Sequence, residues 1–466
     1  MDLNSILQAQ KSHWADQRNR SVTARMEQLR KLEEMLLQNK AELAAAVNKD
    51  FGNRSEYETL FAEILSCVND IGHIRKHLRS WSRRQRVAVG WQLWPARAWI
   101  DYQAKGAVGI MAPWNYPISL VIEPLAAALA AGNTAMIKPS EAAPETGALL
   151  KRLLAEIFPE EMVYVALGDV EVSRKFAALP FNHLLFTGST EVGRAIMRAA
   201  AENLTPVTLE LGGKSPAYID DDYSLAEAAR LLGRGKFINA GQTCIAPDYV
   251  LLGRGRAEEF ASELSKWLSR AYPDLQNNPD YTRVINAGQF ARLDTLLTEL
   301  ERQADSPELT LQLLKPLGER VAAQQLLPPV LVLNPDLSSA LMQDEIFGPI
   351  LPIIEVESYP SALEFINQRP RPLAAYYFGK RDAQHFTKNI SAGGICINDT
   401  LLHFAVSGLP FGGIGESGMG AYHGKTGFET FSHRLPVFKQ SRFSGSHFLK
   451  PPWRGFAAKM IKLLVR

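Results

Sequence analysis

Two side chains of this sequence could together make and break a covalent bond to a carbonyl carbon. Glu210 ends an apolar run and precedes Gly212 and Gly213, and Cys244 lies further on in a turn of small residues. A thiolate attacks a carbonyl to form an acyl-enzyme, and a carboxylate can activate the water that hydrolyses it. The pair therefore predicts covalent catalysis, with Cys244 as nucleophile and Glu210 as base.

Both residues also have a structural explanation. Cys244 could be a packed thiol, and Glu210 could be a glutamate that merely ends a strand. The other cysteines, Cys67 and Cys396, lie in a helical apolar pattern and in a strand-like run, so we expect inert core thiols there.

Five further motifs accompany the pair in a fixed order. They are Pro113-Trp114-Asn115-Tyr116-Pro117, Lys138-Pro139-Ser140-Glu141, the segment 186–193, Glu345-Ile346-Phe347-Gly348-Pro349 and Leu409-Pro410-Phe411-Gly412-Gly413. With the Glu210 and Cys244 segments they resemble the aldehyde dehydrogenase superfamily from about residue 20 to about residue 435. The short segment before Cys244, Asn398-Asp399-Thr400 and the glycine-rich segment 418–424 look like its class 3 branch, which includes fatty aldehyde and bacterial coniferyl aldehyde dehydrogenases.

The resemblance implies a role for Asn115 as well. Its side-chain amide and the backbone N–H of Cys244 would stabilise the oxyanion formed when the thiolate attacks an aldehyde. Hydride would then pass to a nicotinamide, and Glu210 would activate water to release a free carboxylic acid. Asn115 has an alternative role, because it could simply cap the helix that follows.

The cofactor expected from the resemblance is NAD, with NADP possible. Glu141 would disfavour a 2′-phosphate, whereas Lys138 could tolerate one. The segment 186–193 lacks the middle glycine of the usual dinucleotide fingerprint, so by motif alone it indicates dinucleotide binding only moderately. The cofactor-binding residues that the resemblance implies are Trp114, Lys138, Ser140, Glu141, Gly188, Ser189, Gly193, Glu345 and Phe347.

The aldehyde itself is less well defined by the sequence. Tyr116, Tyr249, His403 and Phe404 form an aromatic set that would suit a ring, as in coniferyl aldehyde, or a medium or long alkyl chain. Ordinary core packing explains the same residues equally well.

Alternation of short apolar runs with helical patterns predicts the fold class. We expect an α/β protein with two open, mainly parallel sheets, one in a Rossmann-like cofactor domain and one in a catalytic domain, plus a small β arm for bridging and oligomerisation. The expected boundaries are 1–80 with 104–211 for the cofactor domain, 212–396 for the catalytic domain, 81–103 with 397–425 for the arm and 426–466 for a basic tail. Class 3 resemblance implies a homodimer. We also expect one long helix ending near Gly52 and a loop region over 303–325.

Composition limits the other possibilities. With 51 basic and 49 acidic residues, the chain has no net attraction to nucleic acid. Three cysteines and a start without a secretion signal favour a cytoplasmic protein. His73 and His77 share a helix face but lack the acid that a zinc-protease motif requires, so no metal is expected.

The C-terminal tail carries cations around an apolar helical face. It could lie on an anionic membrane surface, cover the substrate entrance or pack on a partner subunit. Two rival functions remain at this point: a non-catalytic relative that keeps the fold, and a membrane-tethered scaffold. The retained Glu210, Cys244 and Asn115 argue against the first, and the cofactor motifs argue against the second.

Overall fold

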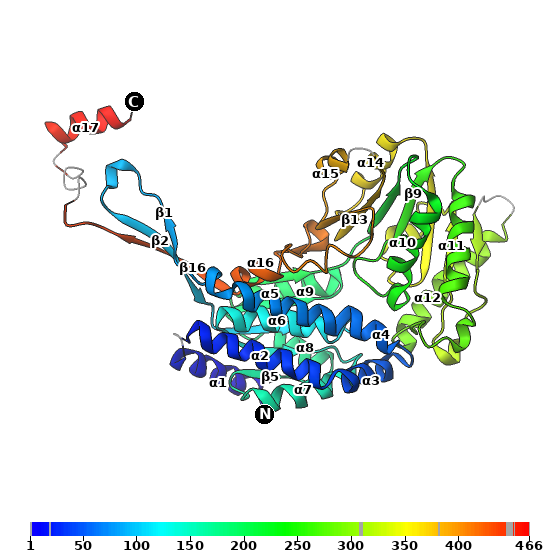
Figure 1. The fold of residues 1–466 in the computed structure, drawn as a ribbon, viewed down its shortest axis with the longest axis horizontal. Coiled ribbons are helices and arrows are strands. Elements are labelled where there is room, and N and C mark those ends of the chain that lie inside the picture. The colour runs from blue at the N-terminus through cyan, green and yellow to red at the C-terminus, as the bar shows by residue number, and fades with distance from the viewer. Residues whose placement is uncertain are drawn as a thin grey trace.

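The chain forms three β-sheets. The computed structural model describes residues 2–17, 20–306, 311–380, 383–443, 451 and 453–465. A six-stranded and a seven-stranded sheet form the two halves of the body, and a three-stranded sheet projects away from it (Figure 1). The predicted fold class, two open and mainly parallel sheets with a small β arm, is confirmed.

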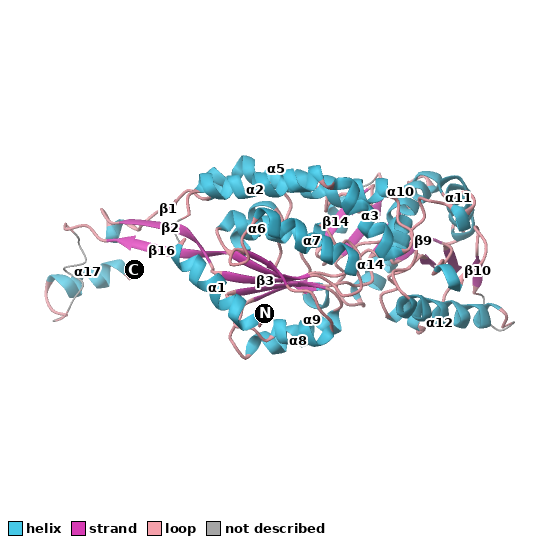
Figure 2. Cartoon of the chain, turned by 90° about the horizontal axis from the view of Figure 1, so that it is seen from below, coloured by secondary structure: helices cyan, strands magenta, loops and turns pink. Residues whose placement is uncertain are grey.

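The six-stranded sheet has the strand order β15-β7-β6-β3-β4-β5 and is parallel except for β15. Its strands are β3 (Ala107–Met111), β4 (Thr134–Lys138), β5 (Val163–Val165), β6 (His183–Thr187), β7 (Val207–Glu210) and β15 (Gly418–Met419). Figure 2 shows helices on both of its faces. On one side lie α6 (Ser119–Ala131) and α7 (Pro144–Ile157), and on the other lie α1 (Leu3–Asp16), α8 (Val170–Ala177) and α9 (Thr190–Ala201).

The seven-stranded sheet has the order β10-β11-β12-β9-β8-β13-β14 and is parallel except for β10. Its strands are β8 (Pro216–Ile219), β9 (Tyr249–Gly253), β10 (Gln312–Leu314), β11 (Val330–Leu333), β12 (Ile350–Val356), β13 (Ala374–Phe378) and β14 (Gly394–Ile397). The helices of this half are α10 (Leu225–Phe237), α11 (Ala257–Ala271), α12 (Ala287–Ala304), α13 (Ala340–Gln343), α14 (Tyr359–Asn367) and α15 (Ala383–Asn389). The edge strand β10 lies within the segment 303–325 that the sequence suggested to be a loop region.

The arm consists of β1 (Gln85–Val87), β2 (Arg97–Ala104) and β16 (Ser432–Lys439), all antiparallel. Its third strand therefore comes from the stretch 426–466, which the sequence placed in a separate tail. The segment 397–425 instead returns to the body, where Gly418 of β15 pairs with Glu210 of β7.

The N-terminal half of the chain adds a layer of helices. The predicted long helix is two helices, α2 (Val22–Gln38) and α3 (Lys40–Phe51), because the side chain of Asn39 donates to the carbonyl of Met35 (2.8 Å) at the break. The second ends at Gly52, as expected, in a left-handed conformation (φ 72°).

The next helical run contains α4 (Glu56–Thr59), a π-helical turn (Leu60–Ile64) and α5 (Leu65–Trp81). Glu63 in the π-helical turn accepts hydrogen bonds from the backbone N–H groups of Ile118 and Ser119 (2.7 and 3.1 Å). A carboxylate thus caps the start of α6 directly after the Asn115 segment.

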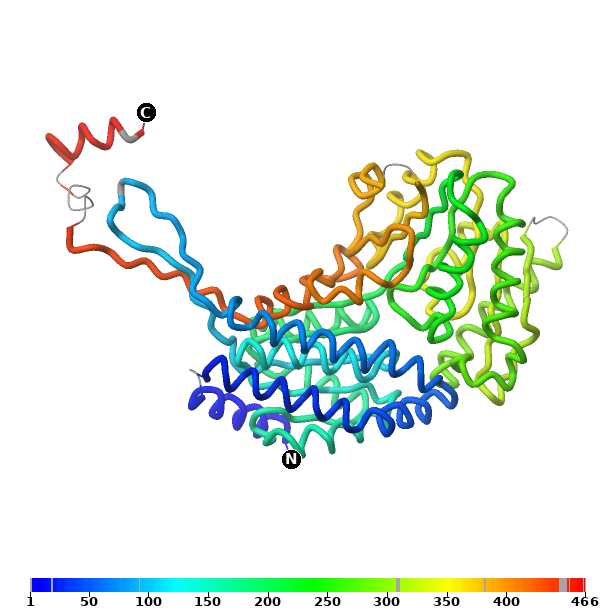
Figure 3. Tube along the Cα trace, viewed as in Figure 1, coloured from blue at the N-terminus to red at the C-terminus, as the bar shows by residue number. Residues whose placement is uncertain are grey.

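The last described elements are α16 (Gly424–Thr430) and α17 (Phe456–Leu464). The tube in Figure 3 places α17 at the same end of the molecule as the arm. Among the described residues, the structure contains no helix of sufficient length and hydrophobicity to cross a membrane.

Candidate active site

Cys244 lies in a tight turn before β9, here called the nucleophile turn (residues 238–245). Asn239, Ala240 and Gly241 all have positive φ angles (51°, 50° and 74°). A Cβ atom added at Gly241 would come within 2.4 Å of the backbone oxygen of Gly348. The turn therefore requires glycine here, both for its conformation and for the close approach of another backbone segment.

Side chains from the first half of the chain hold this turn in place. The amides of Asn115 and Asn239 both donate to the carbonyl of Gln242 (3.1 Å each), and Asn239 also donates to the carbonyl of Asn115 (2.9 Å). The hydroxyls of Tyr116 and Thr243 share a hydrogen bond of 2.7 Å. The structure thus brings the Asn115 segment and the nucleophile turn together.

Arg54 supports this junction and was missed in the sequence. Its side chain is fully buried, donates to the Asn115 carbonyl (2.9 Å) and stacks over the Tyr116 ring at 4.8 Å. Glu58 and Glu63 lie 3.4 Å from its guanidinium and balance its charge. A single arginine outside any motif gives no sequence signal.

Glu210 ends β7 with its side chain buried, 1% exposed. Among the described residues, neither oxygen of its carboxyl group has a hydrogen-bond partner. Burial without partners disfavours the charged form, so the pKa of Glu210 is raised well above its usual value. The carboxyl therefore keeps its proton to a higher pH than an ordinary glutamate does.

The Cys244 thiol is half-buried and reduced. Burial, followed by the nearby Glu345 and Glu210 carboxylates, raises the pKa of Cys244 to about 12, while the backbone N–H groups of Cys244 and Ile245 oppose the shift. Both carboxylates thus act electrostatically on the sulfur. The Cys244 thiol is therefore neutral at rest, and it would need a base to act as a nucleophile.

Glu345 and Phe347 reach the site from the loop before β12. A Cβ atom at Gly212 would lie 2.1 Å from Oε2 of Glu345, so only glycine leaves room for this carboxyl. Burial and the neighbouring Asp248 raise the pKa of Glu345 to about 8. The Phe347 ring packs edge-on against Trp114, with centroids 5.4 Å apart.

Lys138 and Glu141 lie together at the end of β4. The ammonium of Lys138 donates to the Pro139 carbonyl (2.8 Å) and lies 3.4 Å from the Glu141 carboxylate, and the Ser140 hydroxyl accepts from the N–H of Ala142 (3.2 Å). A cavity of about 610 Å³ beside Glu141 is lined by residues of both halves of the chain.

The segment 186–193 leads from β6 into α9. Ser189 caps this helix by accepting from the N–H of Val192 (3.4 Å). A Cβ atom at Gly193 would lie 2.6 Å from the Leu211 side chain, so glycine allows the helix to pack against the end of β7. The buried hydroxyl of Thr187 has no partner among the described residues. A helix N-terminus with a free hydroxyl beside it suits the pyrophosphate of a dinucleotide.

Known proteins are similar to this chain in sequence and in architecture. The model of the aldehyde dehydrogenase family matches residues 1–435. The chain is 47% identical to the probable coniferyl aldehyde dehydrogenase of Pseudomonas aeruginosa (100% of this chain, 96% of that protein) and 36% identical to the dimeric NADP-preferring aldehyde dehydrogenase of Canis lupus familiaris (92% and 93%). It is also similar to the substrate-bound structure of Staphylococcus aureus AldH, with a TM-score of 0.93, 38% identity and 100% of both chains covered.

The chain belongs to the aldehyde dehydrogenase family. It is an enzyme that oxidises aldehydes, as the sequence predicted, and a non-catalytic relative is not favoured.

The aromatic residues suggested for the substrate pocket of this aldehyde dehydrogenase do not all lie together. Phe404 packs against Phe411 (4.9 Å between ring centroids), and the His403 ring lies 6.4 Å from the same phenylalanine. Burial lowers the pKa of His403 to about 4, so its ring is neutral. Tyr249 instead packs against Phe365 in a separate hydrophobic cluster behind β9, and the structure does not bring it beside Cys244.

Two tyrosines near the nucleophile were missed. The Tyr376 hydroxyl donates to the carbonyl of Ile245, and the Tyr422 hydroxyl is buried without a partner among the described residues. The carboxylates of Glu123 and Glu210 both raise the pKa of Tyr422, after burial itself. Tyr422 lies in the glycine-rich segment 418–424, which the sequence used only to choose the branch of the family.

We expect Gly241→Ala to lower aldehyde oxidation by about 10²-fold, because a displacement of the nucleophile of about 1 Å can cost that much. Gly255→Ala is the matched control, since Gly255 has the same φ of 74° but nothing within 4 Å of an added Cβ atom. Steady-state rates of both variants test this. Equal activity in the two would show that the close approach to Gly348 does not position Cys244.

Proposed function

We propose that this aldehyde dehydrogenase oxidises its substrate to the carboxylic acid through a thioester on Cys244, with Glu210 as the base and Asn115 as an oxyanion donor. The observation that carries the proposal is the buried Glu210 carboxyl, which has no hydrogen-bond partner among the described residues and acts electrostatically on the Cys244 thiol. A structural glutamate with this burial would be expected to have a partner.

The first step is attack on the aldehyde. Because the resting thiol is neutral, its proton must pass to a base as the C–S bond forms, and the acceptor is Glu210 in its ionised form. Glu210 then releases this proton to solvent, so that it is a base again when the thioester is hydrolysed. The Asn115 amide, which the Gln242 carbonyl already orients, and the Cys244 N–H then stabilise the oxyanion. Removal of one such donor typically costs about 10²- to 10³-fold in rate.

The cofactor would be held by residues from both halves of the chain. Lys138, Glu141 and the start of α9 would bind the adenosine and pyrophosphate portions, with Ser140 beside them and Gly188 and Gly193 keeping the approach open. Glu345, Phe347 and Trp114 would bind around the nicotinamide. When bound, the nicotinamide of NAD or NADP accepts the hydride that leaves the substrate carbon. The carboxylate of Glu141 lies close to Lys138, and its negative charge would repel the 2′-phosphate of NADP. This supports NAD as the preferred form.

Hydrolysis of the thioester is assigned to Glu210. Water attacks the acyl carbon as Glu210 takes a water proton, and the C–S bond breaks to return the Cys244 thiol and the free acid. The raised pKa of Glu210 makes its carboxylate a stronger base than that of an ordinary glutamate, which favours this proton transfer.

We expect Glu210→Gln to lower turnover by about 10²- to 10⁴-fold and to leave an acyl group on Cys244. Intact-mass spectrometry after mixing with aldehyde and NAD measures the adduct. Glu202→Gln, on the exposed C-terminal end of α9, is the control and should behave as the wild type. Normal turnover without an adduct would remove Glu210 from this role.

The same assignment predicts a pH dependence. The raised pKa of Glu210 means that the carboxylate forms only as pH rises above the usual glutamate range, so wild-type thioester hydrolysis should accelerate with pH until this group is ionised. Glu210→Gln should lose this dependence. Single-turnover rates across pH measure it.

For the substrate, we propose an aromatic aldehyde such as coniferyl aldehyde, with medium- or long-chain aliphatic aldehydes as the second candidate. The proposal is supported by the name of the Pseudomonas aeruginosa relative and by the aromatic rings of Trp114, Tyr116 and Phe404, which pack against the same hydrophobic core as Cys244. The ranking of kcat/KM values over a panel of both aldehyde classes decides between them.

We also propose that the arm mediates a homodimer. Its tip exposes large apolar side chains, with Trp91 and Trp94 exposed by 71% and 73% and Phe438 by 50%. The free edges of a projecting three-stranded sheet, together with these side chains, fit a second copy of the chain. The expected domains, a cofactor half and a catalytic half joined through this arm, remain part of the same proposal.

We expect the double substitution Val87→Lys and Phe438→Lys to convert a dimer into a monomer, because both side chains are exposed on the arm. Light scattering coupled to size exclusion measures the mass. Leu204→Lys, at an exposed leucine outside the arm, is the control. A wild-type monomer, or a dimer that the double substitution leaves intact, would contradict the proposal.

For the basic C-terminal tail we propose the same three alternative roles as the sequence suggested. It contacts an anionic membrane surface, covers the substrate entrance or packs on a partner subunit. In α17, the apolar side chains of Phe456 and Leu463 are exposed together with the basic side chains of Lys459 and Lys462. A cytoplasmic location with peripheral membrane contact is consistent with this amphipathic composition.

A further inference from the structure

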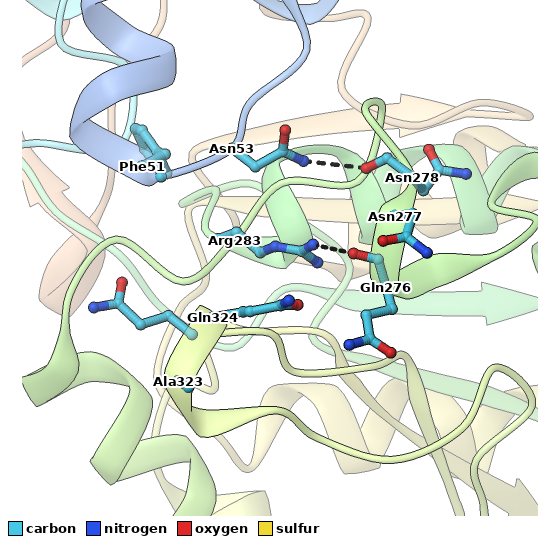
Figure 4. A pocket seen from close by; sticks show the side chains of 10 residues that line it. Phe51, Asn53, Gln276, Asn277, Asn278, Arg283, Ala323 and Gln324 are labelled. Atoms are coloured by element: carbon cyan, nitrogen blue, oxygen red, sulfur yellow. Dashed lines mark hydrogen bonds between the residues drawn. The ribbon is translucent and has the colours of Figure 1, made fainter.

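A polar cavity lies where the end of α3 meets loops of the catalytic half. Its volume is about 470 Å³, and Figure 4 shows its lining side chains converging from three segments of the chain. The lining residues are Phe51, Gly52, Asn53, Gln276, Asn277, Asn278, Arg283, Ala323, Gln324 and Gln325. Amides dominate this set, and Arg283 is its one charged residue.

Arg283 is buried, 7% exposed, but has an incomplete set of partners. Its Nη2 atom donates to the carbonyl of Gln276 (2.6 Å), as Figure 4 shows, whereas Nη1 is buried without a partner among the described residues. Across the part of the chain that the structure describes, no carboxylate forms an ion pair with Arg283. Burying a guanidinium without a counterion costs free energy, and a bound anion would offset that cost.

The nearby carboxylates have other partners. Glu58 pairs with Arg54, Asp280 accepts from the hydroxyl of Ser55 (2.8 Å), and Asp274 accepts from the amide of Asn277 (3.1 Å). Asp274 and Asp280 are also exposed to solvent, which screens their charges. The positive charge of Arg283 therefore stays available to a ligand.

We propose that this cavity binds a small oxyanion, the phosphate or carboxylate group of a metabolite. Arg283 supplies a planar fork of donors that matches two oxygens of such a group. The amide of Gln324 adds a neutral donor, and it also suits a hydroxyl group on the rest of the ligand. None of the residues assigned to the cofactor, the nucleophile or the aldehyde lines this cavity.

The site is connected to the nucleophile turn by hydrogen bonds. The Arg283 carbonyl accepts from the side chain of Gln242 (3.0 Å), whose Oε1 atom accepts from the N–H of Ile285 (3.0 Å). The same Gln242 presents its carbonyl to Asn115. On the other side, Asn53 donates to the carbonyls of Asn278 and Tyr281 (3.1 and 2.8 Å). An anion bound here would thus lie where the two halves of the chain meet. Only Gln242 would separate Arg283 from Asn115 in this chain of hydrogen bonds.

The test is titration calorimetry on the full-length, cofactor-free protein with inorganic phosphate, sulfate and acetate, at an ionic strength held constant with sodium chloride. We expect one saturable site for at least one of these ions, and the preferred ion distinguishes a phosphate from a carboxylate ligand. Arg283→Gln should weaken binding by at least about tenfold because it removes the charged donor.

Two further variants make the test specific. Asn277→Asp leaves Arg283 in place but adds a negative charge at the exposed mouth of the cavity, so it should weaken binding to a similar extent even if Arg283→Gln folds poorly. Arg270→Gln, at an exposed arginine of α11, should bind as the wild type does. No saturable binding of any of the three ions, or wild-type affinity in both Arg283→Gln and Asn277→Asp, would overturn the proposal.

Discussion

The burial of Glu210 beside the Cys244 thiol is the constraint on which the rest of the structure depends. Water cannot solvate this carboxyl, and none of the described side chains binds it, so its proton affinity is high. The thiol is affected in the same way and stays protonated. Both groups therefore resist ionisation, and the carboxylate of Glu210 raises the pKa of the Cys244 thiol further.

That position is set by contacts across the two halves of the chain. Glu210 ends a strand of the six-stranded sheet, whereas Cys244 precedes a strand of the seven-stranded sheet. Asn115 and Tyr116 from the first half bind directly to the nucleophile turn of the second. Arg54 donates a hydrogen bond to the Asn115 carbonyl, and Glu58 and Glu63 balance the charge of its guanidinium. A relative shift of the two halves would separate Glu210 from Cys244.

The sequence predicted those parts of the fold that depend on local pattern. Apolar runs such as Val108–Met111 and Val330–Leu333 are strands because a parallel sheet covered by helices buries both of its faces. Four-residue β8 gives a weak signal in the sequence because it begins at Pro216, a residue that usually argues against a central strand. The break at Asn39 was missed because a side-chain hydrogen bond, and not the apolar spacing, ends α2.

The site was predictable to the extent that its residues lie in motifs. Asn115, Glu210, Cys244 and Glu345 could be named because the family resemblance preserves their neighbours. Arg54 and Tyr376 could not, because each lies outside the motifs and reaches the site by a long-range hydrogen bond to a backbone carbonyl. Tyr249 was suggested for the substrate pocket because it is aromatic and close to Cys244 in sequence. It instead packs in the hydrophobic cluster on the other side of β9.

The pH dependence of Cys244 alkylation by iodoacetamide, followed by peptide mass spectrometry, tests the central claim most directly. In the wild type the Glu210 carboxylate helps to raise the pKa of this thiol. Replacement of Glu210 by glutamine should therefore move the onset of alkylation to lower pH, while Glu202→Gln should leave it unchanged. Coincident profiles for the wild type and Glu210→Gln would contradict the account, because the carboxyl and the sulfur would then not share one site.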